Sequence, residues 1–357
     1  MNNKLPVWLN GQGHQRDIVI SSRVRLARNL ENYRFPHGMN KEQMQELIRS
    51  VEATIKEPAF IKGVGRLSML KLDELTALDR EYLLEQHLIS PGMVENWRGR
   101  ALVTGLEESI SILINEEDHF RIQSFISGLN LQDAYIIADK VDDALDGFYE
   151  FAFHEQYGYL TSCPTNVGTG IRLSVMLHLP GLSMAGGLAA VQQDLKKDGF
   201  VIRGFFGEGS EGYGSLFQIS NQFTLGVKEE EVMQCLERRI DEVIGLEKEA
   251  RMQLFSQKPA QMEDMIYRAY GSLRYARILT AREGMNDLSL VRLGLERGLR
   301  FEGVVDYTRL NSLIVLAQPA ALQKYFNRLM SADERDRERP KLFREILELG
   351  GVQNDLG

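Results

Sequence analysis

Residues 109–123, SISILINEEDHFRIQ, place three consecutive acids directly behind a run of β-branched and apolar residues. The first half of this stretch has the length and composition of a buried strand. The acids are Glu116, Glu117 and Asp118, and Arg121 follows Glu117 by four residues. Taken alone, such an acidic turn is a solvated surface feature, so a chemical role must find support elsewhere in the chain.

The flanking sequence, from Asp17 to about Gly226, alternates β-like runs with helical stretches. Residues 40–56, NKEQMQELIRSVEATIK, keep the helical period of apolar positions. The β-like runs are DIVISSRVRL (17–26), SISILINEED (109–118), GYLTSCPTN (158–166), FVIRGFF (200–206) and SLFQISNQFTLG (215–226). This mixture predicts a catalytic-type domain that combines helices with a sheet.

One uncharged stretch, Leu173 to Val191, approaches the length of a membrane span. His178, Pro180 and several glycines interrupt it. We therefore expect a buried helix, a turn at LPG and the start of a second helix.

Helical periodicity dominates after Gly226. It begins in VKEEEVMQCLERRIDEVIGLEKEARMQLF (227–255) and predicts further helices at about 261–283, 287–297, 306–317 and 320–330. Ser331, with Glu334 three residues later, predicts a capping box that starts a last helix. Because no low-complexity linker separates the two parts, we expect the helical part to dock directly on the first.

Composition narrows the class of protein. The 357 residues carry 42 basic and 50 acidic side chains, a net charge of −8, which argues against binding to nucleic acid or to an anionic membrane. Two cysteines, Cys163 and Cys235, are too few for a disulfide scaffold. The N-terminal residues lack the apolar segment of a signal peptide, so we expect a cytoplasmic protein.

Arginines cluster in four motifs near strand ends or glycine-rich turns. Arginine outnumbers lysine 29 to 13, and its planar fork binds phosphate oxygens in pairs. Strand alternation puts Arg23 and Arg25 on one face. Together with Arg121, Arg172 and Arg203 they could hold a polyphosphate without the P-loop motif, which the sequence lacks.

Four ordered segments, SSRVRLAR, INEEDHFRI, TSCPTNVGTGIR and RGFFGEGSEG, resemble the signature segments of the phosphagen (guanidino) kinases across roughly residues 17–226. The resemblance implies an α+β fold: a glutamine-synthetase-like catalytic domain with a central, mostly antiparallel sheet flanked by helices. It implies transfer of the γ-phosphoryl group of MgATP to a guanidino nitrogen. The Mg²⁺ would be held mainly through the nucleotide, and we expect no metal site built by the protein.

The same resemblance implies roles for individual residues. Glu117 and Glu208 would hold the acceptor guanidinium, with Glu117 as the base, and Cys163 would contact and orient it. A guanidinium is a poor nucleophile until a positioned carboxylate takes its proton. Glu116 and Asp118 would support the site or contact magnesium-bound water, and the sequence leaves both roles open. The implied nucleotide contacts are Ser21, Ser22, Arg23, Val24, Arg25, His87, Arg121, Arg172, Leu173, Ser174, Val175, Met176, Arg203, Gly204, Phe205, Phe206, Gly207 and Glu208.

The chain departs from small-molecule guanidino kinases at both ends. About twenty residues precede SSRVR, where those enzymes carry a helical domain, and a helical extension follows the catalytic motifs. With LTSCPTNVGTG and GEGSE, these features resemble the bacterial protein arginine kinases over essentially the whole chain. The resemblance implies a catalytic domain at 15–246 and an all-α domain at 247–357 for dimerisation and phosphoarginine binding.

A charged segment near the C-terminus matches the phosphoarginine receptor of that family. By default it would be a solvated helix face. Asp336 could hold a guanidinium, Arg335 and Arg339 could hold the phosphate, and Pro340 should disturb the helix. The segment comprises Arg335, Asp336, Arg337, Glu338, Arg339 and Pro340.

The first hypothesis is therefore an ATP-dependent kinase of arginine side chains in proteins. The resemblance further implies a homodimer, an activator protein, a Clp-type protease as partner, and a role in stress-related degradation. Two alternatives stay open: a kinase for free arginine or another small guanidine, and a phosphoarginine-binding adaptor whose kinase site is vestigial.

Overall fold

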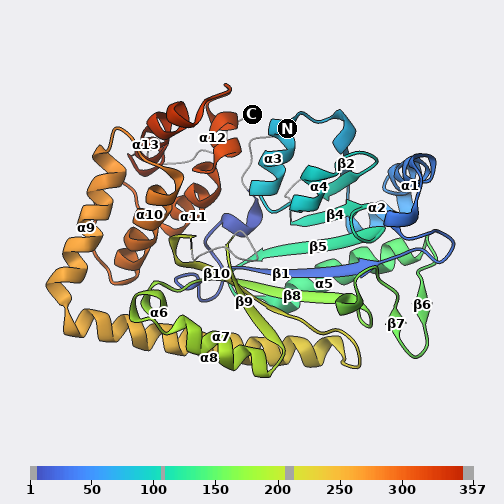
Figure 1. The fold of residues 1–357 in the computed structure, drawn as a ribbon, viewed down its shortest axis with the longest axis horizontal. Helices are drawn as coiled ribbons and strands as arrows, with labels where there is room; N and C mark the ends of the chain where they lie inside the picture. Colours follow the sequence, from blue (N-terminus) through green and yellow to red (C-terminus); the bar gives the residue numbers. More distant parts are fainter. Residues whose placement is uncertain (1–5, 106–108, 206–212, 349–357) are drawn as a thin grey trace.

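The computed structural model describes residues 6–105, 109–205 and 213–348. Within these ranges an antiparallel sheet has the strand order β2-β3-β4-β5-β1-β8-β10-β9, with β1 near its centre (Figure 1). This confirms the expected α+β class. The strands are β1 (Val19–Arg28), β2 (Leu67–Lys71), β3 (Ala101–Gly105), β4 (Ile110–Ile114), β5 (Phe120–Ser127), β8 (Ile171–His178), β9 (Phe200–Gly204) and β10 (Leu216–Asn221).

Alternation along the central strands separates the two faces of the sheet. In β1, Val24 and Leu26 are buried in a core packed with helical residues such as Leu145 and Ile240, whereas Arg23 and Arg25 on the opposite face keep part of their surface. The helices that flank the sheet or its edges include α1 (Lys41–Thr54), α2 (Pro58–Val64), α5 (Leu131–Asp146), α6 (Pro180–Ala185) and α7 (Leu188–Lys197).

The expectation of a helix from Leu173 is wrong. Residues 171–178 form β8, which lies between β1 and β10, and α6 begins at Pro180. An apolar run buried at the centre of a sheet has the same composition as a buried helix, so its periodicity does not separate the two. The strand expected at 158–166 is limited to β7 (Gly158–Tyr159), which pairs with β6 (Phe153–His154).

The C-terminal half is helical, as expected, and packs directly on the sheet. Ser331 and Glu334 form the expected capping box, with hydrogen bonds of 2.7 and 3.3 Å. A second core joins these helices to Trp8, Ile20 and Phe125. The helices are α8 (Glu229–Gln257), α9 (Pro259–Tyr275), α10 (Ala281–Glu296), α11 (Tyr307–Leu316), α12 (Pro319–Tyr325) and α13 (Ala332–Glu348).

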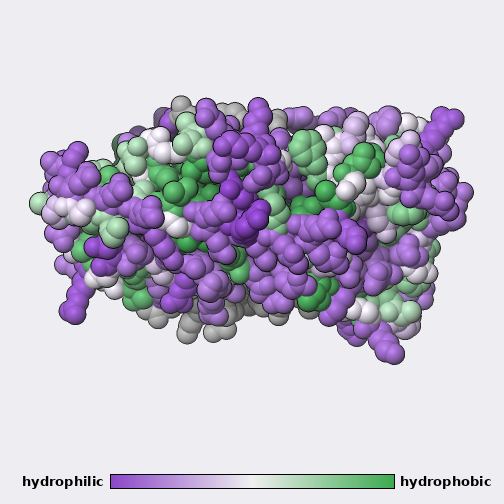
Figure 2. Space-filling model, turned by 90° about the horizontal axis from the view of Figure 1, so that it is seen from below, coloured by the Kyte–Doolittle hydropathy of each residue, from purple (hydrophilic) through white to green (hydrophobic). Residues whose placement is uncertain are grey.

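Helix α8 runs along the lower edge of the molecule, beneath both the sheet and the C-terminal helices (Figure 1). From below, the surface is mainly hydrophilic, with hydrophobic areas on both sides of its centre (Figure 2). In the part of the chain that the structure describes, no helix combines the length and apolarity needed to cross a bilayer.

Candidate active site

Strand register brings the predicted arginines to one face of the sheet. Arg25 in β1 lies opposite Arg172 in β8, and Arg203 in β9 lies opposite Gln218 in β10. Arg121 lies in β5, the neighbour of β1 on its other side. A cavity of about 1030 Å³ is lined by these arginines and by Arg23.

Burial and neighbouring positive charges lower the pKa of two arginines in this cavity, Arg23 and Arg25. Burial, followed by the charges of Arg121 and Arg172, lowers the pKa of Arg23 to about 10. Burial and the same neighbours, with Arg23, also lower the pKa of Arg25. A guanidinium keeps its proton even so, and the arginines therefore repel one another. A bound polyanion would relieve this repulsion between them. The donor set therefore fits the triphosphate of ATP.

His87 forms part of the cavity wall, directly after α3 (Ala77–Glu85). Its φ of 61° places it in the left-handed region, and its ring packs edge-on against Phe205, with centroids 4.9 Å apart. Burial, then the charge of Arg23, lowers the pKa of His87 to about 3, so the ring is neutral near pH 7. Its buried Nε2 has no hydrogen-bond partner among the described residues, which leaves a polar atom for a nucleotide.

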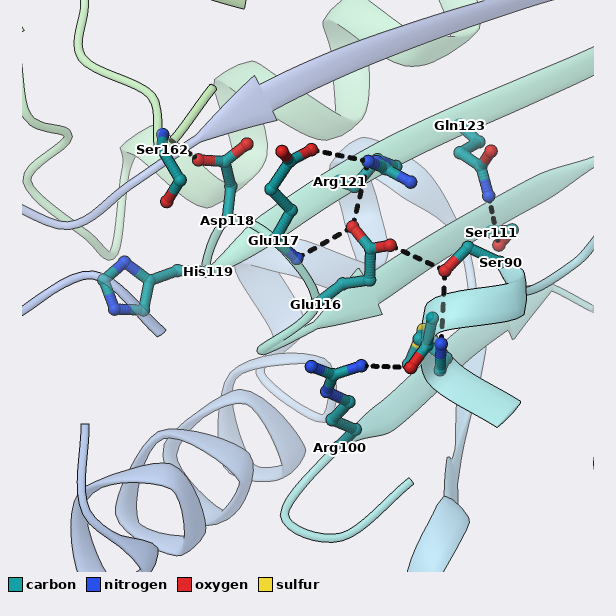
Figure 3. Close-up of polar contacts among 12 residues, drawn as sticks. Ser90, Arg100, Ser111, Glu116, Glu117, Asp118, His119, Arg121, Gln123 and Ser162 are labelled. Carbon is teal, nitrogen blue, oxygen red and sulfur yellow. Dashed lines mark hydrogen bonds and ion pairs between the residues drawn. The ribbon is translucent and has the colours of Figure 1, made fainter. Parts of the chain in front are cut away.

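In the acidic turn between β4 and β5, Glu116 and Glu117 contact Arg121, whereas Asp118 points toward Ser162, as Figure 3 shows. Arg121 Nη2 lies 2.9 Å from Glu116 Oε2 and 3.2 Å from Glu117 Oε2. Glu116 also accepts hydrogen bonds from the Ser90 hydroxyl at 2.6 Å and from the Glu117 N–H at 2.8 Å. Burial favours a higher pKa for Glu116, but Arg121 and these donors lower it overall.

Glu117 has a different environment from Glu116. Burial raises its pKa against the opposing charge of Arg121, and its side chain keeps 41% of its surface. An exposed carboxylate with a raised pKa is closer to the proton affinity that a general base needs near pH 7. The geometry therefore suits Glu117, more than Glu116, to act on an acceptor.

Asp118 ties the acidic turn to the segment that carries Cys163. The carboxylate is 1% exposed, and its Oδ1 accepts hydrogen bonds from Asn29 Nδ2 at 2.6 Å and from the Ser162 N–H at 2.7 Å. Asn29 in turn donates to the Leu160 carbonyl. These bonds give Asp118 an anchoring role that its position in the motif did not reveal.

A second cavity, of about 640 Å³, opens beside the acidic turn. Its lining includes Glu116, Glu117 and Ser162, together with Trp97 and Arg98. Cys163 is partly exposed next to Ser162, and its Sγ lies 3.0 Å from Thr165 Oγ1. Glu117 therefore faces a space large enough for a side chain and part of its parent polypeptide.

Several expected nucleotide contacts do not line the main cavity. Val24, Leu173 and Val175 alternate into the core, and the Ser22 hydroxyl bonds Gly128 O and Asn130 N at 2.9 Å each. Strand alternation turns the neighbours of each arginine to the opposite face, so a nucleotide contact of these residues stays a prediction. A small adjoining pocket includes Ser21, Ser174 and Met176, and the main cavity includes Gly204 and Phe205.

Three of the expected contact residues, Phe206, Gly207 and Glu208, lie outside the described residues. Conversely, the cavity has wall residues that the motifs did not indicate. They include Gln123 and Gln218 on strands, and Ala281, Gln318 and Pro319 from the helical half. Their types carry no chemical signal, so sequence reasoning had no means of finding the last three.

The predicted receptor segment forms part of α13. Pro340 does not interrupt this helix, which corrects the expectation of a disturbance there. Arg339 is 1% exposed, and one of its nitrogens lies 2.6 Å from Asp336 Oδ1. Arg337 is exposed, and Arg335 donates to the Met330 carbonyl at 2.9 Å. The segment therefore has an inner arginine and a partly exposed outer face.

Comparisons with known proteins agree with this geometry. Residues 46–250 match the model of the ATP:guanido phosphotransferase C-terminal catalytic domain, and residues 259–355 match that of the protein-arginine kinase McsB C-terminal domain. The chain is 27% identical to a duplicated taurocyamine kinase from Schistosoma mansoni, with a TM-score of 0.60 over 70% of this chain and 35% of that one. A lombricine kinase structure, 24% identical with a TM-score of 0.57 over 69% of this chain and 71% of that one, shares the fold.

Curated relatives match over almost the full length. The protein-arginine kinase of Symbiobacterium thermophilum is 45% identical over 95% of this chain and 96% of its own. That of Pelotomaculum thermopropionicum is 42% identical over 96% of each chain. The chain is a guanidino phosphotransferase and belongs to the protein-arginine kinase (McsB) family.

Proposed function

We propose that the protein transfers the γ-phosphoryl group of MgATP to arginine side chains of other proteins. The observation that carries this proposal is the position of Arg121, whose guanidinium lies in the wall of the cationic cavity while it pairs with Glu117 at the edge of the second cavity. A donor phosphate and an acceptor guanidinium could thus approach from opposite sides of one ion-paired group.

The residues of the site have separate roles in phosphoryl transfer. The arginines hold the phosphates and stabilise the negative charge of the transferring group, as phosphoryl transfer requires. Glu117 orients the acceptor guanidinium and accepts its proton as the nitrogen attacks the γ-phosphorus. The bond from that phosphorus to the bridging oxygen breaks, and ADP leaves. Mg²⁺, arriving with the nucleotide and held mainly by its phosphates, would neutralise further charge. We assign Glu208 to the second edge of the guanidinium and Cys163 to its orientation, as the family resemblance implies.

The acceptor is proposed to be a protein because the second cavity, of about 640 Å³, is lined by Pro36, His37 and Trp97 as well as by Glu117. We further propose a catalytic domain at 15–246, a helical domain at 247–357 that supports a homodimer and binds phosphoarginine, and a cytoplasmic location. Activation by a partner protein and delivery of tagged substrates to a Clp-type protease under stress complete the proposal.

The test is incubation with MgATP and either an unfolded arginine-containing protein or free arginine. Phosphorus NMR and mass spectrometry would identify a phosphorus–nitrogen bond on arginine. Modification of the protein supports the proposal. Modification of free arginine alone would favour the small-guanidine kinase, and ATP-independent binding of phosphoarginine without any transfer would favour the adaptor.

A further inference from the structure

The nucleotide cavity has a wall that comes from the helical half of the chain. Ala281 starts α10, and Gln318 and Pro319 form the turn that starts α12. These residues belong to two segments separated along the chain, so something must hold both segments at the edge of the catalytic sheet. Contacts with α13 fix the positions of both segments.

Pro340 creates the first of these contacts. In an α-helix the carbonyl of Asp336 would accept the N–H of residue 340, but proline has no N–H. The helix nevertheless continues, and the Asp336 carbonyl accepts the Leu279 N–H at 2.8 Å instead. The proline thus frees a carbonyl that fixes the segment two residues before Ala281.

Arg339, the residue before this proline, holds both wall segments at once. Its buried guanidinium donates from Nη1 to the Leu279 carbonyl at 2.6 Å and from Nε to the Ala317 carbonyl at 2.8 Å. Ala317 directly precedes Gln318. One planar fork therefore sets the spacing between the Leu279–Ala281 segment and the Ala317–Pro319 segment.

The catalytic half meets the same wall through α3, which lies beside α12 (Figure 1). The Glu85 carboxylate accepts the Ala320 N–H at 2.8 Å and the Ala321 N–H at 2.7 Å. Lys324 forms an ion pair with Asp79 in the same interface. Glu85 also lines the cavity, two residues before His87, so the wall is fixed on both sides.

Tyr213 gives an independent link between the cavity and the helical half. It lines the cavity, and burial raises the pKa of its hydroxyl against the opposing charges of Arg339 and Arg282. The next residue, Gly214, donates its N–H to Asn286 Oδ1 at 3.3 Å, with a φ of 60° and no room for a Cβ, which would lie 2.7 Å from the Met285 carbonyl. The backbone after the glycine-rich motif therefore rests on α10.

We infer that Arg339 and Pro340 are positioning residues for ATP: without touching the nucleotide, they hold the wall that the helical domain contributes to its cavity. The inference rests on the proposed function in one respect, the assignment of the cationic cavity to ATP. It assigns a structural role to a proline in the interior of a helix, where proline is otherwise only tolerated.

Pro340→Ala is the sharpest test, because alanine restores an N–H at position 340. That N–H competes with Leu279 for the Asp336 carbonyl, while alanine favours the helix. The expected result is an unchanged or raised thermal midpoint of unfolding together with a several-fold rise in the KM and Kd for ATP and a nearly unchanged kcat at saturation. Lys341→Ala, at an exposed neighbouring position on α13, is the matched control and should match wild type in all of these values.

Arg339→Lys provides a second variant. A lysine keeps the charge but lacks the fork that spans the Leu279 and Ala317 carbonyls, so the KM for ATP should rise here also. An unchanged KM and Kd for ATP in a folded Pro340→Ala protein would overturn the inference, and so would loss of folding in that variant, since the inference requires α13 to accept alanine. A wild-type protein that fails to bind ATP would instead refute the proposed function.

Discussion

Glu117 shares one nitrogen of Arg121 with Glu116, at 3.2 and 2.9 Å respectively. Glu116 is further held by Ser90 and the backbone, whereas Glu117 projects toward the second cavity with 41% of its side chain exposed. Arg121 therefore fixes the base by one end and faces the nucleotide cavity with the other.

Glu117→Gln should abolish phosphoryl transfer while leaving the arginine wall intact, because glutamine keeps the shape of the side chain but cannot accept the proton. Loss of one general base costs about 10²- to 10⁴-fold in rate. The measurement is kcat, with the Kd for ATP determined in parallel by calorimetry. Glu263→Gln, an exposed position on α9, is the control. A Kd for ATP that weakens as much as kcat would count against the assignment.

Arg203→Lys should not preserve activity. Arg203 lines the nucleotide cavity from β9, and an ammonium cannot span two phosphate oxygens as a guanidinium does. We expect kcat/KM for ATP to fall at least tenfold, about 1.4 kcal/mol of transition-state stabilisation. Steady-state kinetics at varied ATP provide the measurement. Near-normal turnover would make Arg203 a bystander.

Asp118→Ala should displace the segment that carries Cys163. The substitution removes the acceptor for Asn29 and for the Ser162 N–H, which leaves buried donors unsatisfied at a cost of about 1–3 kcal/mol. Asp118→Asn keeps an acceptor oxygen and should lose less. Urea unfolding measures the stability, and the rate of Cys163 alkylation reports its placement. Equal alkylation rates in wild type and Asp118→Ala would show that Asp118 does not position that segment.

Sequence reasoning identified the arginines because their type, strand alternation and motif order all pointed to one face. The side chains of Ser22 and Val24 point away from the cavity, since a motif marks a strand and does not say which side of the strand carries the chemistry. Sequence reasoning also missed Ala281 and Pro319. Their contribution depends on a contact between distant segments, and small apolar residues give no local sign of such a contact.

The hydrogen bond that Pro340 makes possible could not be predicted from the sequence for a related reason. From sequence, an interior proline predicts a broken helix. The structure keeps the helix because Leu279, about sixty positions away, supplies the missing donor. Local propensity describes the cost of a residue in isolation, and a tertiary hydrogen bond can offset that cost.

Glu85 should make stability depend on pH. Burial first, and then the charge of Glu81, raises its pKa to about 7 from the ordinary 4.5, against the opposing Ala320 and Ala321 N–H groups. A carboxyl with a raised pKa in the folded state stabilises the fold below the unfolded-state pKa, and this contribution is lost as pH rises through about 7.

Glu85→Gln should remove that dependence. Urea unfolding of both proteins at pH 4.5 and pH 8 gives the comparison, and the wild type should lose on the order of 1–3 kcal/mol more than the variant over this range. The same loss in both proteins would mean that Glu85 keeps an ordinary pKa and that another group titrates.

The proposed receptor segment on α13 should bind phosphoarginine through its outer face. Asp336 can pair with a guanidinium and the partly exposed Arg335 with a phosphate, whereas Arg339, also expected to hold the phosphate, is buried. The two outer residues would discriminate against arginine, which lacks the anion, and against phosphoserine, which lacks the cation. Asp336 also contacts Arg339. The test variant is therefore Asp336→Asn, which removes the negative charge but keeps an oxygen that can accept a hydrogen bond. We expect calorimetric titration to show at least tenfold weaker binding of phosphoarginine by this variant, and kinase assays to show a smaller stimulation by added phosphoarginine, since allosteric coupling is typically about 1–3 kcal/mol.

Asp333→Asn, an exposed position on the same helix, should behave as wild type. Equal binding by the wild type and both variants would mean that the segment is a solvated helix face. The inner roles inferred for Arg339 and Pro340 would not be affected.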